Sequence, residues 1–568
     1  MTRGEWSTMS QKNENPYASK PWLKFYDKGV PTHIDYPEIP LYEFLESAAK
    51  DFGSRTAIYF LKRKMSYKEF KDITDRLATA LANLGVKKGE VVAVILPNFP
   101  QFLFSYYGIM KAGATVTTCS TLLTERELAF QLNDAGAETI IAWDRQLEKI
   151  KNIKDRTRLR NIIITGVFDY TPNAQREPPE IAGTMQFVNL VNKAKPNPPK
   201  VKVNAKEYVA VLQYTGGTTG LPKGAMLTHY NLVSNAIATA AWVPDIKRGK
   251  ETALTNLPLF HIYGMTVCMN TLIYNAMTMV LNPDPRDLKS LLELIRETRP
   301  GMFPGVPTVY MRLLERDDIN DYAKDLRSIR ICNTGAAPMP PEVLKDFEKR
   351  TGGKILEGYG LTECSPVTHS NPTGEGKRKI GSAGIPFPDT EVKIVDIADD
   401  TKIMPVGKEG EIMVKGPQVM KGYWNKPEET KNQMRDGWVK TGDIGKMDAD
   451  GYFYIVDRKK DMIDVSGFKV YPREVEDILY EHKAVLMASV IGIPDPQTPG
   501  NESVKAFVVL KDGYKEGDEL ANEIKEFCKK ELAPYKVPKS VEFRKELPET
   551  LVGKVLRKEL REQESRAE

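Results

Sequence analysis

At residues 214–224 the chain reads Tyr-Thr-Gly-Gly-Thr-Thr-Gly-Leu-Pro-Lys-Gly, directly after an apolar run, Tyr208 to Gln213, that predicts a β-strand. Glycines let successive backbone N–H groups turn toward an anion, while the three threonines and Lys223 add hydroxyl donors and positive charge. Such a loop suits a polyphosphate. It is not a Walker A loop, because Gly224 stands where that motif requires Ser or Thr. A flexible glycine linker is the alternative, and the threonines and the lysine argue against it.

The region before this loop alternates helical and strand patterns. Ser66 followed by Glu69 has the pattern of a capping box, and apolar residues then recur at helical spacing from Phe70 to Leu84. The run from Val91 to Leu96 is continuously apolar and ends at Pro97, as expected for a parallel strand that is covered on both faces. Alternating helices and strands predict an α/β fold.

Composition changes twice along the rest of the chain. Residues 171–207 are rich in Pro, Asn and Lys, which favours an irregular connection between two α/β subdomains. After Gly381, short strand patterns such as 391–395 and 411–415 predict a small β-rich unit. Beyond Arg458 a compact α/β pattern returns, with Pro472 at a helix start. We therefore predict a large N-terminal domain, made of two α/β subdomains and a β-rich subdomain, followed by a small C-terminal α/β domain.

Charge and cysteine usage exclude several classes of function. The 568 residues include 81 basic and 76 acidic side chains, a net charge of +5, which is a mixed surface rather than the basic stripe of a nucleic-acid-binding protein. No nucleic-acid partner is expected. The five cysteines are far apart and form no CxxC pair, so neither a disulfide framework nor a zinc site is predicted.

Two stretches bear on membranes and targeting. Residues 1–20 are polar and lack the apolar core of a signal peptide, so we expect a cytoplasmic protein. Between Glu251 and Asp284 no charged residue occurs, and 264–281 approaches the length of a membrane span. Asn and Thr residues interrupt that stretch, however, and a buried strand–helix–strand passage is favoured over a membrane span.

Further motifs follow the phosphate loop in a fixed order. They are Gly358-Tyr-Gly-Leu-Thr-Glu363, Thr441-Gly-Asp443, Asp457-Arg-Lys-Lys460, and Gly553-Lys554 with Arg557. Together with residues 214–224 they resemble the motifs of the acyl-adenylate-forming superfamily, in particular its acyl-CoA synthetase branch. The resemblance runs from about Leu41 to Arg557, nearly the whole chain.

The resemblance implies an ATP-dependent acid–thiol ligase. Such an enzyme adenylates a carboxylic acid and then passes the acyl group to coenzyme A, with ATP and CoA as co-substrates and Mg²⁺ as cofactor. The substrate carboxylate must approach an anionic α-phosphate, and two unit charges ~4 Å apart repel by roughly 4 kcal/mol at an effective dielectric of about 20. Cations must therefore gather there. The resemblance assigns Mg²⁺ to Glu363, a bridge between carboxylate and α-phosphate to Lys554, and a hydroxyl donor to Thr362.

The resemblance also implies nucleotide and acyl contacts. His261 matches a histidine that separates the two pockets, and a core histidine with its hydrogen bonds satisfied is the alternative for this residue. Taken singly, Asp443 is typical of a turn, and Arg458 and Lys554 of solvated surface charges; their order and spacing favour the functional interpretation. The implied ATP and AMP contacts are Thr215, Gly216, Gly217, Thr218, Thr219, Gly220, Lys223, Gly335, Ala336, Ala337, Gly358, Tyr359, Gly360, Asp443 and Arg458. The implied acyl pocket is Tyr263, Gly335, Ala336 and Val367.

An acyl-adenylate must be kept from water and then opened to a thiol. The resemblance implies a pivot near Lys460 that withdraws Lys554 and brings Ser466-Gly467-Phe468 to the CoA tunnel. We accordingly expect an N-terminal domain at 1–457, a hinge at 458–460 and a C-terminal domain at 461–568. The sequence departs from luciferase-type members at Asp464, where they carry a lysine used in the second step.

Several alternatives stay open at this point. The chain's opening, 21–31, resembles fatty acyl-CoA synthetases, while 260–264 also resembles aryl-acid ligases. A medium- or long-chain fatty acid is favoured, with a cinnamate-like acid or the loading of a separate carrier protein as alternatives. A luciferase-type monooxygenase or a catalytically silent binding protein would use the same fold, and the intact motifs favour activity over the latter. A homodimer is expected by analogy.

Overall fold

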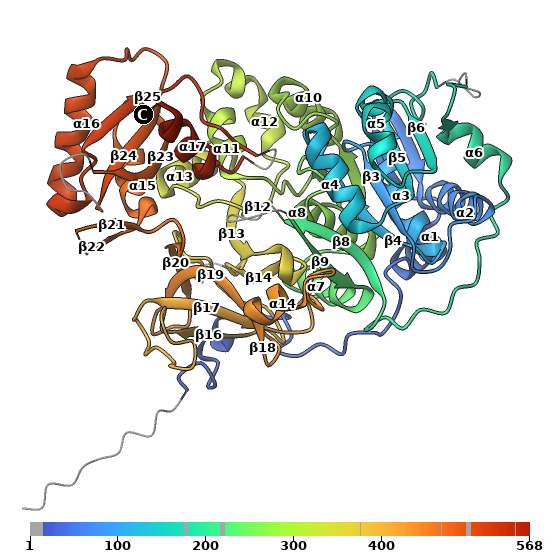
Figure 1. The fold of residues 1–568 in the computed structure, drawn as a ribbon, viewed down its shortest axis with the longest axis horizontal. Coiled ribbons are helices and arrows are strands. Elements are labelled where there is room, and N and C mark those ends of the chain that lie inside the picture. Colours follow the sequence, from blue (N-terminus) through green and yellow to red (C-terminus); the bar gives the residue numbers. More distant parts are fainter. Residues whose placement is uncertain are drawn as a thin grey trace, which may run out of the picture.

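The structure is a computed structural model that describes residues 15–174, 180–215, 222–374, 377–466, 468–495, 501–550 and 553–567. Figure 1 shows a broad α/β body, a β-rich unit below it, and a smaller α/β unit at the C-terminal end of the chain beside both. The predicted fold class is confirmed.

The largest sheet is mainly parallel and carries the phosphate-loop strand near one edge. Its order is β7 (Met185–Gln186), β6 (Asn161–Thr165), β5 (Thr139–Trp143), β3 (Val91–Ile95), β4 (Thr115–Thr118), β8 (Val209–Thr215) and β9 (Lys223–Thr228). The prediction for Val91–Leu96 is confirmed, since β3 lies between β4 and β5 and is buried throughout. The expectation of an irregular 171–207 connection was wrong in part, because β7 and α6 (Phe187–Lys193) lie inside it and pack on this sheet.

A second sheet interleaves with the first along the chain. Its order is β10 (Thr252–Thr255), β11 (Thr278–Leu281), β1 (Thr56–Phe60) and β2 (Arg63–Ser66). Strand β1 pairs in parallel with β11, so that Ile58 faces Met279. The two α/β subdomains are therefore not consecutive, because the N-terminal hairpin joins the later sheet. Single bridges from Met302 to Ala253 and to Ile331 extend this sheet to β12 (Ile331–Thr334), beside β13 (Lys354–Gly360), β14 (Val367–Ser370) and β15 (Ile385–Pro386).

Helices cover these sheets and in part lie between them. In the body they are α1 (Glu43–Phe52), α2 (Tyr67–Asn83), α3 (Pro100–Lys111), α4 (Glu125–Ala135), α5 (Leu147–Ile153), α7 (His229–Ala241), α8 (Ile262–Met265), α9 (Thr271–Tyr274), α10 (Leu288–Thr298), α11 (Pro307–Leu314), α12 (Ala323–Leu326) and α13 (Pro341–Thr351). Helix α3 is buried along its full length in the main apolar core. Ser66 caps α2 by accepting from the Glu69 N–H at 3.1 Å, but the Glu69 carboxylate pairs with Arg63, so only half of the predicted capping box forms.

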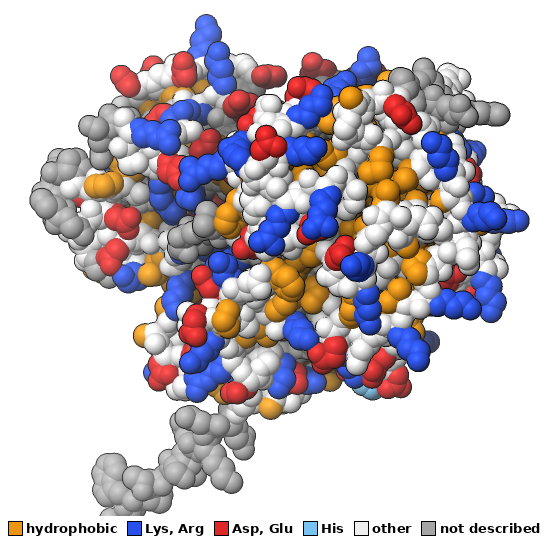
Figure 2. All heavy atoms as spheres, turned by 45° about the vertical axis from the view of Figure 1, so that its right-hand side comes forward, with side chains coloured by type: hydrophobic (Ala, Val, Ile, Leu, Met, Phe, Trp, Pro, Cys, Tyr) orange, Lys and Arg blue, Asp and Glu red, His pale blue; other side chains and the backbone are white. Residues whose placement is uncertain are grey.

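The uncharged stretch at 251–284 is a buried passage, as expected. It consists of β10, α8, a π-helical turn (Thr266–Asn270), α9 and β11. No helix among the described residues is both long and apolar enough to cross a bilayer. Figure 2 shows acidic and basic side chains intermixed over one face of the molecule, with hydrophobic side chains gathered toward its middle.

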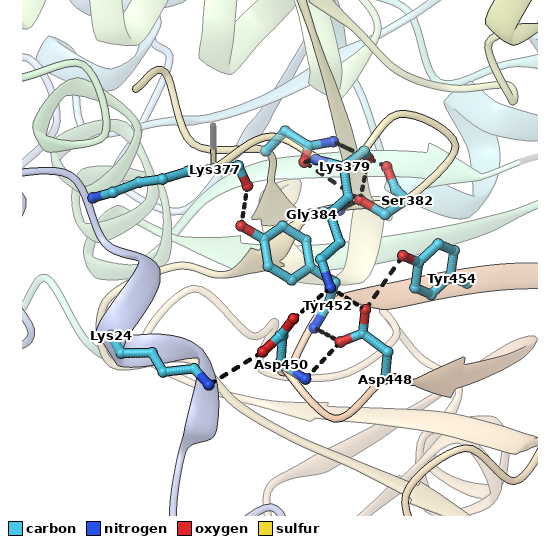
Figure 3. Close-up of polar contacts among 10 residues, drawn as sticks. Lys24, Lys377, Lys379, Ser382, Gly384, Asp448, Asp450, Tyr452 and Tyr454 are labelled. Atoms are coloured by element: carbon cyan, nitrogen blue, oxygen red, sulfur yellow. Dashed lines mark hydrogen bonds and ion pairs between the residues drawn. The ribbon is translucent and has the colours of Figure 1, made fainter. Parts of the chain in front are cut away.

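The β-rich unit confirms the strands predicted after Gly381. It contains β16 (Glu391–Val395), β17 (Gly410–Lys415), β19 (Trp438–Met447) and β18 (Met434–Arg435), with β20 (Phe453–Arg458) paired to β19 and α14 (Pro427–Gln433) alongside. Ion pairs between side chains hold the turn between β19 and β20 (Figure 3). Lys379 pairs with Asp448 at 2.6 Å and with Asp450 at 2.9 Å, and Lys24 pairs with Asp450 at 3.2 Å. These contacts fix the start of the strand that ends at Arg458.

The C-terminal unit is a small α/β layer. A hairpin, β21 (Ile463–Val465) and β22 (Phe468–Val470), precedes α15 (Pro472–Glu481), which begins at the predicted proline. A sheet β23 (Val485–Pro494), β24 (Glu502–Leu510) and β25 (Ser540–Phe543) packs with α16 (Asp518–Glu531) and α17 (Arg557–Ala567).

Apolar and polar contacts join the C-terminal unit to the body. Met311 of α11 packs with Met487, Phe507 and Leu560 of the C-terminal unit. Arg312, also on α11, pairs with Glu549 at 3.3 Å. Gly553 sits directly on the body, with a positive φ of 63°, and a Cβ there would lie 2.0 Å from Oγ1 of Thr308. Only glycine fits this approach, which sets the position of the next residue, Lys554.

Candidate active site

The described residues cover most of the predicted site. Gly216, Gly217, Thr218, Thr219 and Gly220 of the phosphate loop, and Gly467 of the CoA motif, lie outside them. The two ends of the phosphate loop are held by strand pairing, because Thr215 at the end of β8 faces Lys223 at the start of β9. The loop therefore spans a closed antiparallel pair at the edge of the main sheet.

Lys223 and the predicted metal residue meet on one aromatic ring. The Lys223 ammonium lies 5.3 Å above the ring centre of Tyr423 and pairs with Glu429 on α14. The Tyr423 hydroxyl donates to Oε1 of Glu363 at 2.6 Å. Glu363 follows Thr362 in a short 3₁₀ turn, Thr362–Cys364, after β13. Loop lysine, carboxylate and aromatic ring thus form one cluster at the mouth of the phosphate loop.

Asp443 lies inside β19 and not in a turn, the setting that is typical of its residue type alone, and it faces Arg458 directly across the β19–β20 pair. Its carboxylate is nearly fully buried. One oxygen pairs with the Arg458 guanidinium at 3.2 Å, and the other accepts from the Tyr359 hydroxyl at 2.6 Å. A carboxylate has about four lone-pair positions, so Asp443 keeps capacity for further donors such as sugar hydroxyls.

The C-terminal loop brings Lys554 into this group. Burial, together with the positive charges of Arg458 and Lys460 and opposed by Asp443 and Asp461, lowers the pKa of Lys554 from 10.5 to about 7. The Lys554 ammonium also affects His261. Burial, which is the larger cause, and the charge of Lys554 lower the pKa of His261 to about 4, so its imidazole is neutral at pH 7. Burial is thus the main reason that Lys554 loses its proton, and an anionic ligand beside it would favour its charged form.

Small residues form a wall beside these charges. A Cβ on Gly335 would lie 3.4 Å from the Gly358 carbonyl and 3.6 Å from the Tyr263 ring, so the space between the three is narrow. Ala336 has a positive φ of 68° and is exposed, and Ala337 follows it. A Cβ on Gly360 would lie 2.2 Å from the Pro366 carbonyl, which requires glycine.

The predicted acyl residues Tyr263 and Val367 border this wall from two sides. The Tyr263 hydroxyl donates to the Asn333 carbonyl at 3.0 Å, and Val367 exchanges hydrogen bonds with the side chain of Asn235 on α7. Both side chains are partly buried. The structure thus brings the small residues predicted to contact the nucleotide, Gly335 to Ala337, and the acyl-pocket candidates together around β12, β13 and β14.

The CoA candidates stand apart from this group. Figure 1 shows the β21–β22 hairpin, which carries Ser466 and Phe468, away from β13 and β14. Phe468 is 55% exposed and stacks on Tyr535 at 4.6 Å. Lys460 lies between the two groups in sequence, and burial and Arg458 lower its pKa to about 8. In this arrangement the Lys554 ammonium is within electrostatic reach of Asp443 and Arg458, whereas Ser466 and Phe468 belong to the separate β21–β22 hairpin.

Sequence reasoning missed Tyr423, Glu429 and Thr308. Tyr423 reaches the site because it forms a bridge to Ala225 of β9, a pairing between segments almost two hundred positions apart that no local pattern signals. Glu429 could have been suspected as an acid at the first turn of a helix after Pro427, but its partner could not. The Tyr359–Asp443 bond likewise needs two separate sheets to meet.

Family comparison is consistent with this geometry. Residues 45–424 match the model of the AMP-binding enzyme family, and residues 474–554 match the model of the AMP-binding enzyme C-terminal domain.

Individual relatives cover almost the full chain. The long-chain-fatty-acid–CoA ligase of Bacillus subtilis (strain 168) is 45% identical over 562 residues, which span 96% of this chain and 99% of that protein. A feruloyl-CoA synthase of Amycolatopsis sp. is 36% identical over 508 residues, 89% of this chain and 95% of that one. Among solved structures, an anthranilate CoA ligase in complex with anthranoyl-AMP superposes with a TM-score of 0.85 at 29% identity, covering 94% of this chain and 99% of that one.

Proposed function

The chain belongs to the family of AMP-binding enzymes, and on this premise we propose that it is a long-chain-fatty-acid–CoA ligase. In the first step a fatty-acid carboxylate oxygen bonds to the α-phosphorus of ATP and pyrophosphate leaves. In the second step the thiol of coenzyme A attacks the acyl carbon and AMP leaves. Full-length relatives with this activity, together with the site geometry, support the proposal.

One observation carries the first step: Lys554 from the C-terminal unit lies within electrostatic reach of Asp443, Arg458 and His261. A positive group aimed at the point where two anions must meet lowers the barrier most when it is already in place. Gly553 fixes that placement against Thr308. We assign to Lys554 the bridge between the carboxylate and the α-phosphate, and to Asp443 and Arg458 the ribose and phosphate contacts.

His261 and the glycine wall have a different role in the proposal. A neutral imidazole at pH 7 neither attracts nor repels the incoming carboxylate, so His261 divides the nucleotide side from the acyl side. Gly335 has no side chain to fill the narrow space beside the Gly358 carbonyl and the Tyr263 ring, and we assign to it a backbone contact with the bound adenylate. Tyr263 and Val367 would then contact the acyl chain, and Thr362 the α-phosphate.

The residues present fit a Mg²⁺ ion held jointly with ATP. Glu363 offers a carboxylate, the ligand type that Mg²⁺ prefers alongside phosphate oxygens, and its bond from Tyr423 leaves acceptor positions on the same group. Among the described residues no cluster of three or more His, Cys, Asp or Glu could hold a metal without other ligands. A bound Mg²⁺ would neutralise phosphate charge, and Lys223 would add a second cation to it.

The second step requires the C-terminal unit to turn. We infer that rotation at Lys460 withdraws Lys554 and brings the hairpin with Ser466 and Phe468 to the acyl-adenylate. Asp464 on that hairpin is a carboxylate that pairs with Lys469, so the thiol step finds no lysine ammonium at position 464. A homodimer in the cytoplasm completes the proposal, and sedimentation velocity would test the dimer.

The test is CoA-dependent AMP release from ATP across acids from acetate to palmitate, with cinnamates included. We expect AMP release to be fastest with long-chain acids. Lys554→Ala should abolish this AMP release, and Lys558→Ala on the exposed side of α17 should retain it. A preference for cinnamates would move the assignment to an aryl-acid ligase, which the feruloyl-CoA synthase relative makes the second candidate. Pyrophosphate exchange without CoA-dependent turnover would instead indicate a carrier-protein loader.

A further inference from the structure

Asp457 directly precedes the predicted hinge at 458–460, and its buried carboxylate binds partners that lie beyond that hinge in the chain. Its side chain is 3% exposed. Oδ1 accepts from the Arg557 guanidinium at 3.0 Å and from the Arg458 backbone N–H at 2.7 Å. Oδ2 accepts from the Arg473 backbone N–H at 2.8 Å. Arg473 and Arg557 both belong to the C-terminal unit, whereas Asp457 is the last residue but one of β20 in the β-rich unit.

The contact with Arg473 caps a helix from outside. Helix α15 begins at Pro472, and its own N-cap residue, Tyr471, makes no side-chain cap bond. The first N–H groups of a helix lack internal partners and carry partial positive charge, so a carboxylate beside them is stabilising. Asp457 fills that place. The Arg473 side chain adds a second link by donating to the Ile455 carbonyl at 2.6 Å.

The contact with Arg557 leads to the catalytic lysine. Arg557 is the first residue of α17 and follows Lys554 by three positions. Within the C-terminal unit it is gripped by Glu476, which accepts from Nη2 at 2.7 Å and from Nε at 3.2 Å, and by Asp461 at 3.5 Å. Glu476 in turn accepts from the Val490 N–H at 2.8 Å. Arg557 therefore belongs to the C-terminal unit, and its bond to Asp457 crosses the hinge, as do the two bonds from Arg473.

We propose that Asp457 is a positioning residue for the adenylation step, a latch that holds the C-terminal unit so that Lys554 stays in the active site. Rotation at Lys460 leaves Asp457 with the β-rich unit and carries Arg473 and Arg557 away. The latch therefore acts in the first half-reaction and is released in the second. This inference rests on the proposed function for its kinetic consequence, but the contacts themselves exist without substrate.

The test replaces the carboxylate by an isosteric amide, Asp457→Asn, and measures the two half-reactions separately. Single-turnover acyl-AMP formation without CoA is expected to slow about tenfold, equivalent to about 1.4 kcal/mol. Thioester formation from supplied acyl-AMP and CoA is expected to change by less than about twofold, because the latch is already open in that step. Asp400→Asn, which removes an ion pair with Lys440 and Arg435 inside the β-rich unit, is the matched control and should change neither rate.

A readout without turnover separates this inference from the proposed function. Hydrogen exchange of the peptide 471–480 should speed up in Asp457→Asn and not in Asp400→Asn, even if no acid in the panel is a substrate. Arg473→Ala removes the bond to the Ile455 carbonyl and a 3.7 Å ion pair with Asp477 on the same helix, but keeps the backbone N–H that donates to Asp457. It should shift both readouts in the same direction by a smaller factor, and it serves if Asp457→Asn does not fold. Equal slowing of both half-reactions, or unchanged exchange at 471–480 in both variants, would refute the latch.

Discussion

Binding of ATP is expected to draw a proton onto Lys554. With no ligand in the site, burial and the neighbouring charges of Arg458 and Lys460 lower the pKa of this lysine to about 7. At pH 8 about one tenth of the Lys554 side chains would then carry the proton. The phosphates of ATP add negative charge beside the ammonium and should return its pKa toward its ordinary value of 10.5. About 0.9 proton should therefore be taken up for each ATP bound at pH 8.

The same shift fixes the sign of a stability effect. Between pH 7 and 10.5 an unfolded or withdrawn Lys554 holds a proton that the inserted residue gives up, so insertion becomes more favourable as pH rises through this range. Below pH 7 the ammonium must be buried with its charge. The gap between 10.5 and about 7 corresponds to about 5 kcal/mol as an upper estimate at about 1.4 kcal/mol per pKa unit.

Titration calorimetry in buffers of different ionisation enthalpy measures the proton uptake directly. Wild-type protein with MgATP at pH 8 should show the uptake, and Lys554→Met, which keeps the length of the side chain without the amine, should remove it. Lys558→Met on the exposed face of α17 is the control that should keep it. If the uptake is absent at pH 8, or equal in wild type and Lys554→Met, then Lys554 is not the buried amine that the structure describes.

Three further predictions address the other parts of the site. Gly553→Ala should slow acyl-AMP formation by more than about tenfold, because its Cβ would overlap Thr308 and the backbone there is left-handed, while thioester formation from supplied acyl-AMP should be unchanged. Adding Thr308→Ala should restore part of the rate of acyl-AMP formation, and no recovery would mean that the overlap with Thr308 is not the cause. Asp443→Asn should raise the KM for ATP in pyrophosphate exchange by at least about tenfold, since a charge-assisted hydrogen bond contributes about 1.5–3 kcal/mol, and an unchanged KM would contradict the ribose assignment. Glu363→Gln should raise the Mg²⁺ concentration for half-maximal exchange by roughly tenfold, as expected when an acidic ligand is lost, whereas Glu428→Gln on the outer side of α14 should leave that concentration unchanged.

Local patterns predicted elements well, and they failed where partners are distant. Strand β3 and helix α15 were predictable because an apolar run or a proline start depends on neighbouring residues alone. The interleaved sheets were not, since Ile58 pairs with Met279 across more than two hundred positions. Only half of the capping box at Ser66 forms, for the same reason on a smaller scale: the Glu69 carboxylate pairs with Arg63, a partner that no helix-start pattern includes.

The site shows the same division between motif and partner. Ordered motifs indicated Asp443, Arg458 and Lys554 before any geometry was known, and the register of β19 with β20 now gives a physical reason why the first two lie together. Their catalytic roles stay predictions until they are assayed, as do the domain boundaries at 457 and 461. Tyr423 escaped because an aromatic residue in a loop carries no charge pattern, although it contacts both Lys223 and Glu363.

The lowered pKa of Lys554 and the latch at Asp457 both contribute to the free-energy difference between the two positions of the C-terminal unit. Inserting an ammonium into a desolvated site is unfavourable by up to about 5 kcal/mol before ATP binds. Contacts at a distance from the site must offset part of that cost, and Asp457 with Arg557 and the α15 N-terminus is placed to do so. If these contacts were much stronger, the C-terminal unit could not leave after adenylation. The cost of the buried charge at Lys554 and the releasable contacts of Asp457 oppose each other, which keeps the two positions of the C-terminal unit close in free energy. Binding of ATP, and then formation of the acyl-adenylate, can therefore shift the population from one position to the other.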